Sequence, residues 1–350
     1  MSDHTTEIGD PTGAHDDRAG AGPGPRLALI IAWSASDPGA TGALIQVPGP
    51  RAQPLVFGRS ASDPRAQPIR QLPGENRALP PLTSRRISRK QLRLQALAGG
   101  RVTVEQQGRC PLLVRGQRVE QAVLAAGDIV ELEGQLLLLC VERPAVLPPA
   151  RHWSVDPSRP LGAPDRCGLV GESPAMWRLR DQIAFVGGHP GHALVLGPSG
   201  VGKELVARAL HSLSGRADRP LVARNAATIP ATLIDAELFG NAANYPNHGM
   251  PERPGLIGEA HLSTLLLDEI GELPEALQAH LLRLMDRGEY QRLGESRTRT
   301  ADLQLVAATN RPREALKADL GARFRHVITV PSLDKRREDL PLLIRHLLLE

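Results

Sequence analysis

A glycine-rich turn between an apolar run and an amphipathic run is the first segment whose residues could do chemistry. Residues 194–211 read LVLGPSGVGKELVARALH. Glycines let backbone amides approach phosphate oxygens, a helix N-terminus adds positive potential, and a lysine reaches the terminal phosphates. A glycine-rich turn can also arise by chance, and Glu204 stands where a Ser or Thr usually helps to hold Mg²⁺. The predicted phosphate contacts are Gly197, Pro198, Ser199, Gly200, Val201, Gly202, Lys203 and Glu204.

Two carboxylates follow further along the chain, in the stretch STLLLDEIGELP. Its apolar run predicts a buried strand that delivers Asp268 and Glu269 to its C-terminal end, where open parallel sheets bind ligands. We expect Asp268 to hold Mg²⁺ and Glu269 to orient or deprotonate an attacking water. Asn310 ends a second buried run, LQLVAATN, and is placed to sense the γ-phosphate. An exposed acidic pair is the alternative, but the upstream loop in the correct order favours a nucleotide site.

The spacing of apolar residues, which predicts the elements that position these side chains, changes along the chain. Residues 26–143 contain many short apolar segments separated by turn residues, a pattern typical of an all-β sandwich. Residues 144–166 are rich in proline and predict a stiff linker. Residues 167–350 alternate helical and buried-strand patterns, which predicts an α/β domain with a parallel sheet. Residues 1–25 lack apolar periodicity and predict disorder.

The segments LVGESPAMWRLRDQI, GPSGVGKELVARALH, RNAATIPATLIDAELFG, TLLLDEIGELP and LVAATNR together resemble a known family. They are similar to the AAA+ ATPase domain of bacterial sigma-54-dependent transcription activators. The resemblance implies a P-loop AAA+ fold, ATP and Mg²⁺ as ligands, ATP hydrolysis and a homo-oligomeric ring. It also implies sigma-54 RNA polymerase as the partner. Because Glu follows the loop lysine in this family, Glu204 does not count against the site.

The resemblance assigns further roles. Asn225 takes the position of the residue that pairs with the catalytic glutamate, and Arg323 that of an arginine finger reaching a neighbour's γ-phosphate. The other finger position holds Lys317, which lacks a bidentate fork; this predicts slower hydrolysis unless Lys317 is an ordinary surface residue. The family's GAFTGA loop, which touches sigma-54, reads Asn244-Tyr-Pro-Asn-His-Gly249 here. A drifted loop that still contacts sigma-54, a different client and no client all stay open.

Within residues 26–143, FGRS and SRRISRKQLRL resemble the signature loops of a forkhead-associated (FHA) domain. That class recognises phosphothreonine proteins through arginine-rich loops. Arg59 and Arg89 can make charge-assisted bonds to phosphate and Ser88 a directional one. The usual histidine of this signature is Gln91, and Arg115 replaces the usual asparagine of a later loop. Arginines that merely solvate a loop are the alternative.

Composition narrows the classes of function that remain possible. A net charge of +4 is too mild to argue for nucleic acid, and the spacing of Cys110, Cys140 and Cys167 favours reduced, structural thiols. No apolar run is long enough to cross a bilayer, so we expect a cytoplasmic protein. The chain ends at Glu350 within the first lid helices, with no DNA-binding element in view, which predicts either a fragment or a protein without one. A phosphopeptide-binding scaffold with a weakly active nucleotide site remains the alternative function.

Overall fold

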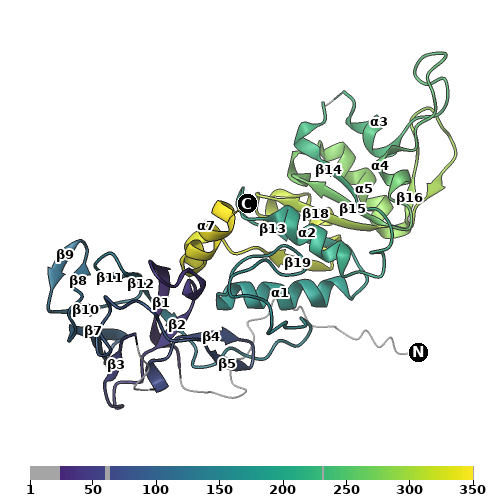
Figure 1. Cartoon of the computed structure of the whole chain (residues 1–350). Helices are drawn as coiled ribbons and strands as arrows, with labels where there is room; N and C mark the ends of the chain where they lie inside the picture. The colour runs from purple at the N-terminus through teal and green to yellow at the C-terminus, as the bar shows by residue number, and fades with distance from the viewer. Residues whose placement is uncertain (1–23, 60–63, 231, 350) are drawn as a thin grey trace, which may run out of the picture.

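The computed structural model describes residues 24–59, 64–230 and 232–349, which form a β-sandwich and an α/β unit. Figure 1 shows the two units side by side, with the C-terminal helix α7 between them. The segment predicted to be disordered lies, up to residue 23, outside the described residues.

The sandwich consists of two antiparallel sheets. The larger has the strand order β5-β4-β2-β1-β12-β11-β8-β9, and the smaller β10-β7-β6-β3. Side chains of β6 and β7 alternate between buried and more exposed, because successive residues of a strand point to opposite faces. The strands are β1 (Arg26–Ser34), β2 (Leu44–Gln46), β3 (Leu55–Phe57), β4 (Ile69–Leu72), β5 (Glu75–Ala78), β6 (Leu92–Leu97), β7 (Arg101–Gln106), β8 (Leu112–Val114), β9 (Gln117–Val119), β10 (Gln121–Leu124), β11 (Ile129–Leu132) and β12 (Leu136–Arg143).

The α/β unit is built on a five-stranded sheet of order β14-β15-β18-β13-β19, in which all paired strands run parallel. The central strand β18 is buried at every residue, as expected for a sheet covered on both faces. A small hairpin, β16–β17, stands apart from this sheet. The strands are β13 (Ala193–Leu196), β14 (Val222–Asn225), β15 (Thr264–Asp268), β16 (Glu289–Tyr290), β17 (Arg299–Thr300), β18 (Gln304–Thr309) and β19 (His326–Thr329).

The start of helix α1 follows from a side-chain cap and a proline. Helix α1 begins after Ser173, whose Oγ accepts a hydrogen bond from the Met176 amide, with a proline at the first helical position. The α-helices are α1 (Pro174–Gly187), α2 (Lys203–Ser212), α3 (Ile234–Phe239), α4 (Gly255–Glu259), α5 (Glu275–Arg287), α6 (Ala318–Arg323) and α7 (Leu340–Leu349). Short 3₁₀ segments are η1 (Pro38–Ala40), η2 (Pro64–Ala66), η3 (Ala226–Thr228), η4 (Ile270–Glu272), η5 (Arg313–Ala315) and η6 (Leu333–Asp339).

Each of the two units has its own hydrophobic core. One core fills the space between the two sheets of the sandwich. Helices α1 and α2 pack on one face of the parallel sheet, and helices α3 to α5 contribute to the core on the other. The predicted fold class, an all-β sandwich followed by an α/β domain with a parallel sheet, is confirmed.

The segment between the units has no helix or strand, yet it is pinned to α1. Asp181 of that helix accepts hydrogen bonds from the backbone amides of residues 151, 152 and 153 through one carboxylate oxygen, at 2.9, 2.7 and 3.0 Å. Trp153 packs with Trp177 of α1 and Leu72 of β4 in a small buried cluster. The linker therefore belongs to the packed structure.

Candidate functional site

The glycine-rich loop connects the end of β13 to the start of α2. Gly200 and Gly202 have φ values of 76° and 98°, in the left-handed region that glycine adopts without strain. Gly202 precedes the first residue of α2, so the loop delivers its amides to the N-terminal end of a ten-residue helix. This is the arrangement in which backbone amides bind anions.

Lys203 is buried at the start of α2 and lies back over this loop. Its Nζ donates to the carbonyl oxygens of Gly197 and Pro198 at 3.1 and 3.3 Å, and Glu269 Oε1 is 3.6 Å away. The ammonium is thus held between the loop and the acidic strand end. Glu204 instead pairs with Arg208, one turn along the exposed face of α2, at 2.7 Å.

The acidic strand end belongs to β15, as predicted. Asp268 is its last residue and lies in register with Asn225 of β14, so both reach the same edge of the sheet. Glu269 follows in a left-handed conformation, with φ 52° and ψ 45°. Such a conformation is uncommon for a residue with a side chain and marks a constrained turn at this edge.

The structure places Asn225 and Asn310 around these carboxylates. The Asn225 amide group lies 3.4 Å from Asp268 Oδ2, so it contacts the first carboxylate of the pair and not Glu269, with which it was expected to pair. The backbone amide of Asn310 donates to Glu269 Oε2 at 3.3 Å. Glu269 is therefore held between Lys203 and the end of β18.

The donor set fits a hard divalent cation. Asp268 presents carboxylate oxygens at the sheet edge beside the glycine-rich loop, residues 197–203, which is called the phosphate loop below. Oxygen donors are those that Mg²⁺ prefers. Burial raises the pKa of Asp268, an effect that the hydrogen bond from the Glu269 amide opposes. A nearby cation would favour the ionised form. Among the described residues, no cluster of three or more His, Cys, Asp or Glu suggests another metal centre.

Arg323 and Lys317 bond to helix α5 of their own chain. Arg323 ends α6, is about half exposed, and forms an ion pair with Asp286 of α5. This pair raises the pKa of Arg323 further. Lys317 precedes the same helix, and its backbone amide donates to Gln278 Oε1 at 3.1 Å. Neither side chain is bonded to the phosphate loop in the described part of the chain.

Sequence reasoning missed Arg336, which contacts the phosphate loop from η6. This side chain is buried, and its NH2 group donates to the carbonyl oxygen of Val201 at 3.2 Å. Its only signal was membership of the charged run LDKRREDL, half of which is exposed. Nothing in that run distinguished the one arginine that folds inward.

In the sandwich, the predicted phosphopeptide residues occupy neighbouring loops. The amide of Arg59 donates to the Ser88 carbonyl oxygen at 3.2 Å, which joins the loop after β3 to the loop before β6. The Ser88 hydroxyl accepts from the amide of Arg109 at 3.0 Å, so a further arginine lies beside it. Arg89 and Arg109 are exposed. Ser60, the last residue of FGRS, lies outside the described residues.

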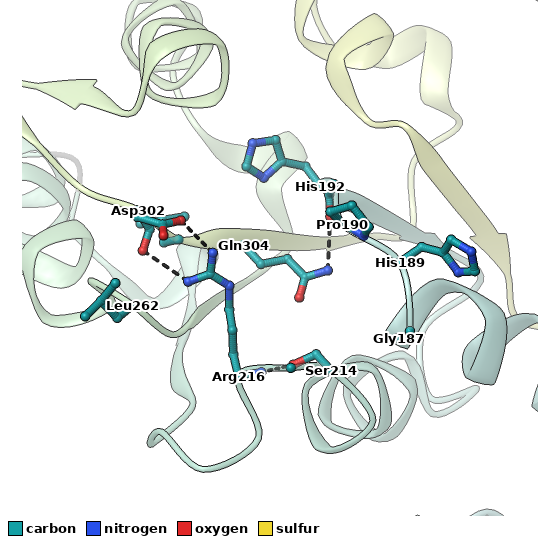
Figure 2. A pocket seen from close by; sticks show the side chains of 13 residues that line it. Gly187, His189, Pro190, His192, Ser214, Arg216, Leu262, Asp302 and Gln304 are labelled. Atoms are coloured by element: carbon teal, nitrogen blue, oxygen red, sulfur yellow. Dashed lines mark hydrogen bonds and ion pairs between the residues drawn. The ribbon is translucent and has the colours of Figure 1, made fainter.

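A cavity of about 630 Å³ lies at the opposite edge of the parallel sheet. Figure 2 shows Arg216 directed toward Asp302 across it, and Gln304 projecting into the same space. The Gln304 amide donates to the Gly191 carbonyl oxygen at 3.0 Å, and His192 Nδ1 accepts from the Leu305 amide at 3.0 Å. These polar groups are therefore already bonded to other parts of the protein.

The cysteine side chains form no disulfide bond in the described part of the chain. The three cysteines are free, and burial raises the pKa of the Cys140 thiol to about 12, so it stays protonated. No helix in the described ranges is long and apolar enough to cross a membrane.

Comparison with known proteins places the α/β unit. Residues 169–327 match the family described as the sigma-54 interaction domain. Most of this unit is therefore similar to the sigma-54 interaction domain. The predicted resemblance to sigma-54-dependent activators is confirmed.

Relatives of the domain are transcription regulators. The transcriptional regulatory protein ZraR of Escherichia coli is 41% identical over 206 residues, covering 57% of this chain and 47% of ZraR. A crystal structure of NtrX from Brucella abortus in complex with ADP is 36% identical and covers 51% of this chain and 40% of NtrX, with a TM-score of 0.47. The chain thus spans less than half the length of these relatives.

The sandwich has a weaker likeness of its own. The FHA domain of CT664 protein from Chlamydia trachomatis is 21% identical, covers 34% of this chain and 99% of that one, and has a TM-score of 0.25. This likeness is too low to assign a ligand to the sandwich.

Proposed function

We propose that the chain binds and hydrolyses ATP as a sigma-54 activator-type AAA+ regulator in the cytoplasm. One observation carries the proposal: the phosphate loop, Lys203, Asp268 and Glu269 meet at the carboxyl edge of a parallel sheet, with Lys203 and Glu269 only 3.6 Å apart. Cation, anion-binding amides and carboxylates in this arrangement suit a Mg²⁺-nucleotide. The sigma-54 interaction domain assigned to residues 169–327 supports it.

Each group has a distinct role in this proposal. Lys203 would exchange its bonds to the loop carbonyls for bonds to the terminal phosphates. Asp268 would hold Mg²⁺, which would neutralise negative charge on the transferred phosphate. Glu269, released by Lys203, accepts a proton from the attacking water or orients it. Asn225 keeps Asp268 in place through its amide group. Asn310, which directly follows β18, contacts the γ-phosphate, so the end of β18 responds to its presence.

Hydrolysis is completed between copies of the chain in a ring. Arg323 sits on the exposed end of α6, paired with Asp286 rather than with its own site, so it is available to a neighbouring copy. An arginine supplied from a neighbour stabilises the charge of the transition state. Lys317, at the other finger position, supplies a charge without a bidentate fork, so we propose slow hydrolysis.

Substitution of Lys203 and of Glu269 separates binding from hydrolysis. We expect Lys203→Ala to abolish binding of a fluorescent ATP analogue, because the main cation of the site is removed. Glu269→Gln should retain binding and lower phosphate release by about 10² or more, since a general base is lost. Lys90→Ala, an exposed lysine of the sandwich, is the control. Equal ATP affinity in wild type and Lys203→Ala would refute the assignment.

The alternative, a phosphopeptide-binding scaffold with a weakly active nucleotide site, has one observation in its favour. The arginines near Ser88 are exposed and clustered on adjoining loops, as a phosphate ligand requires. We propose that the two activities coexist: the sandwich binds phosphothreonine weakly through Arg59, Ser88 and Arg89, and the α/β unit binds ATP.

A further inference from the structure

The sandwich and the sigma-54 interaction domain meet across buried charges. Arg70 of β4 pairs with Glu172 at 2.9 Å, and Arg143 at the end of β12 pairs with Glu338 of η6 at 3.0 Å. Both arginines are only 4% exposed. Removing one partner of a buried ion pair leaves the other charge uncompensated, so a substitution at either partner disfavours the docked arrangement.

These contacts converge on the start of α1 and the end of η6. Arg143 also donates to the carbonyl oxygen of Glu172 at 3.2 Å. Asp339, next to Glu338, accepts the amides of Glu172 and Ser173 at 2.7 and 2.9 Å. The last residues of η6 are therefore fastened both to the sandwich and to the N-cap of α1.

The same short segment reaches the phosphate loop. Arg336 lies two residues before Glu338, in a non-helical conformation (φ −140°, ψ 41°) that interrupts η6. Its guanidinium donates to the Val201 carbonyl oxygen and contacts Met176 Sδ at 3.0 Å. The middle of η6 thus contacts the phosphate loop, while the C-terminal end of η6 is held by the sandwich.

We propose that η6 couples the docked position of the sandwich to the conformation of the phosphate loop. Arg336 is a positioning residue for the loop, and the Arg143–Glu338 pair is the contact that the sandwich controls. When the sandwich moves away, Glu338 loses its partner, η6 shifts, and Arg336 releases Val201. The coupling is reciprocal. Nucleotide at the loop therefore changes the affinity of the sandwich for its docking face, the surface of the α/β unit that carries Glu172 and Glu338. This inference rests on the proposed ATP site.

Helix α7 continues directly from η6 and extends the docking face. Leu342 is buried against Gly42 of the sandwich and Gly162 of the linker, where an added Cβ would collide with it. Arg345 donates to the carbonyl oxygens of Pro38 and Leu161. Figure 1 shows α7 lying between the two units. A displaced sandwich would therefore disturb α7 and η6 together.

Hydrogen exchange tests the coupling without nucleotide. In Arg143→Met and in Glu338→Gln we expect faster exchange of the phosphate-loop amides 199–203 and of η6, with unchanged rates in β15 and β18. Arg143→Lys, which retains the charge, should restore the wild-type rates. Arg118→Met is the matched control, because Arg118 pairs with Glu133 in an exposed salt bridge of the same sheet. A purely structural defect would instead raise exchange throughout the domain.

Nucleotide affinity is the second measurement on the same variants. Because a preordered loop loses less freedom on binding, Arg143→Met and Glu338→Gln should weaken binding of a fluorescent ATP analogue about fivefold. Wild-type exchange at residues 199–203 in both variants would overturn the coupling. If the wild-type chain bound no nucleotide but the exchange change appeared, the ATP proposal would fail and the coupling would stand. Glu338→Gln serves where Arg143→Met does not fold.

Discussion

At the scale of single residues, the side-chain amide of Gln91 makes hydrogen bonds at a position where the FHA signature has a histidine. Gln91 is fully buried, and its Oε1 accepts the Ser88 amide at 3.1 Å while its Nε2 donates to the Cys110 carbonyl oxygen at 2.7 Å. One amide group supplies both a donor and an acceptor, as a neutral imidazole would. The glutamine in the histidine position therefore still ties the candidate phosphopeptide loops together.

The contribution of Asp181 to stability should depend on pH. Burial by itself raises the pKa of Asp181, but the hydrogen bonds from the backbone amides of His152 and Trp153 outweigh it and hold the pKa below its usual value. A carboxyl whose folded pKa is lowered stabilises the protein above its unfolded pKa. That contribution is lost as pH falls through the folded pKa.

We therefore expect Asp181→Asn to lower the free energy of unfolding by about 1–2 kcal/mol at pH 7, since hydrogen bonds to a charged group are lost. The difference from wild type should shrink as the pH falls through the folded pKa of Asp181. Denaturant unfolding at neutral and acidic pH measures both. Asp218→Asn, at an exposed position, is the control, and an equal deficit at both pH values would contradict the prediction.

At the scale of elements, the loop in the GAFTGA position is closed by its own hydrogen bonds. Asn241 and Arg253 exchange backbone hydrogen bonds at 3.1 Å, and the Asn244 amide donates to the Met250 carbonyl oxygen at 2.8 Å. The Tyr245 ring lies against Gly294 in the turn between β16 and β17, where a Cβ would collide with it. The loop tip is thus packed on a neighbouring turn of the same domain.

A packed tip predicts impaired coupling to sigma-54. We expect the native chain to support little open-complex formation by sigma-54 polymerase. A chain with residues 244–249 rewritten to GAFTGA should support more, because the aromatic and threonine tip is restored and the contact with Gly294 removed. Full activation by the native loop would show that this sequence still contacts sigma-54. Equal ATP hydrolysis by the two chains is the control for folding.

At the scale of the whole molecule, arginines of the candidate phosphopeptide loops differ in exposure from those of the interface between the two units. Figure 1 shows β4 on the side of the sigma-54 interaction domain and the β8–β9 hairpin at the far end. Arg70 of β4 is buried in the interface, whereas Arg89 and Arg109 remain exposed. A ligand at these loops can therefore bind while the units stay docked.

We expect the chain to bind a phosphothreonine peptide weakly and its unphosphorylated counterpart not at all. Arg59→Ala should weaken binding about tenfold, since a charge-assisted hydrogen bond is lost. The affinity should also fall with added salt. Arg118→Ala, an exposed arginine elsewhere on the sandwich, is the control. Titration with a phosphothreonine peptide library measures these effects, and equal binding of both peptide forms would leave the sandwich without this function.

The sequence by itself determined the class of the fold and placed the candidate nucleotide-binding residues at one edge of the parallel sheet. Alternating and buried runs have different periods in strands and helices, so the sandwich and the parallel sheet followed from local pattern. The loop with Lys203 and the strand end with Asp268 are contiguous motifs whose edge of the sheet is set by strand direction.

Only the tertiary structure decided which distant side chains meet. Asn225 contacts Asp268 instead of Glu269 because neighbouring parallel strands bring it into register with Asp268. Arg143 and Glu338 are 195 residues apart in the chain and form a buried pair. Arg336 reaches the phosphate loop because a kink in η6 directs it inward. Burial and partner choice depend on how whole units pack, and no local spacing of residue types encodes that.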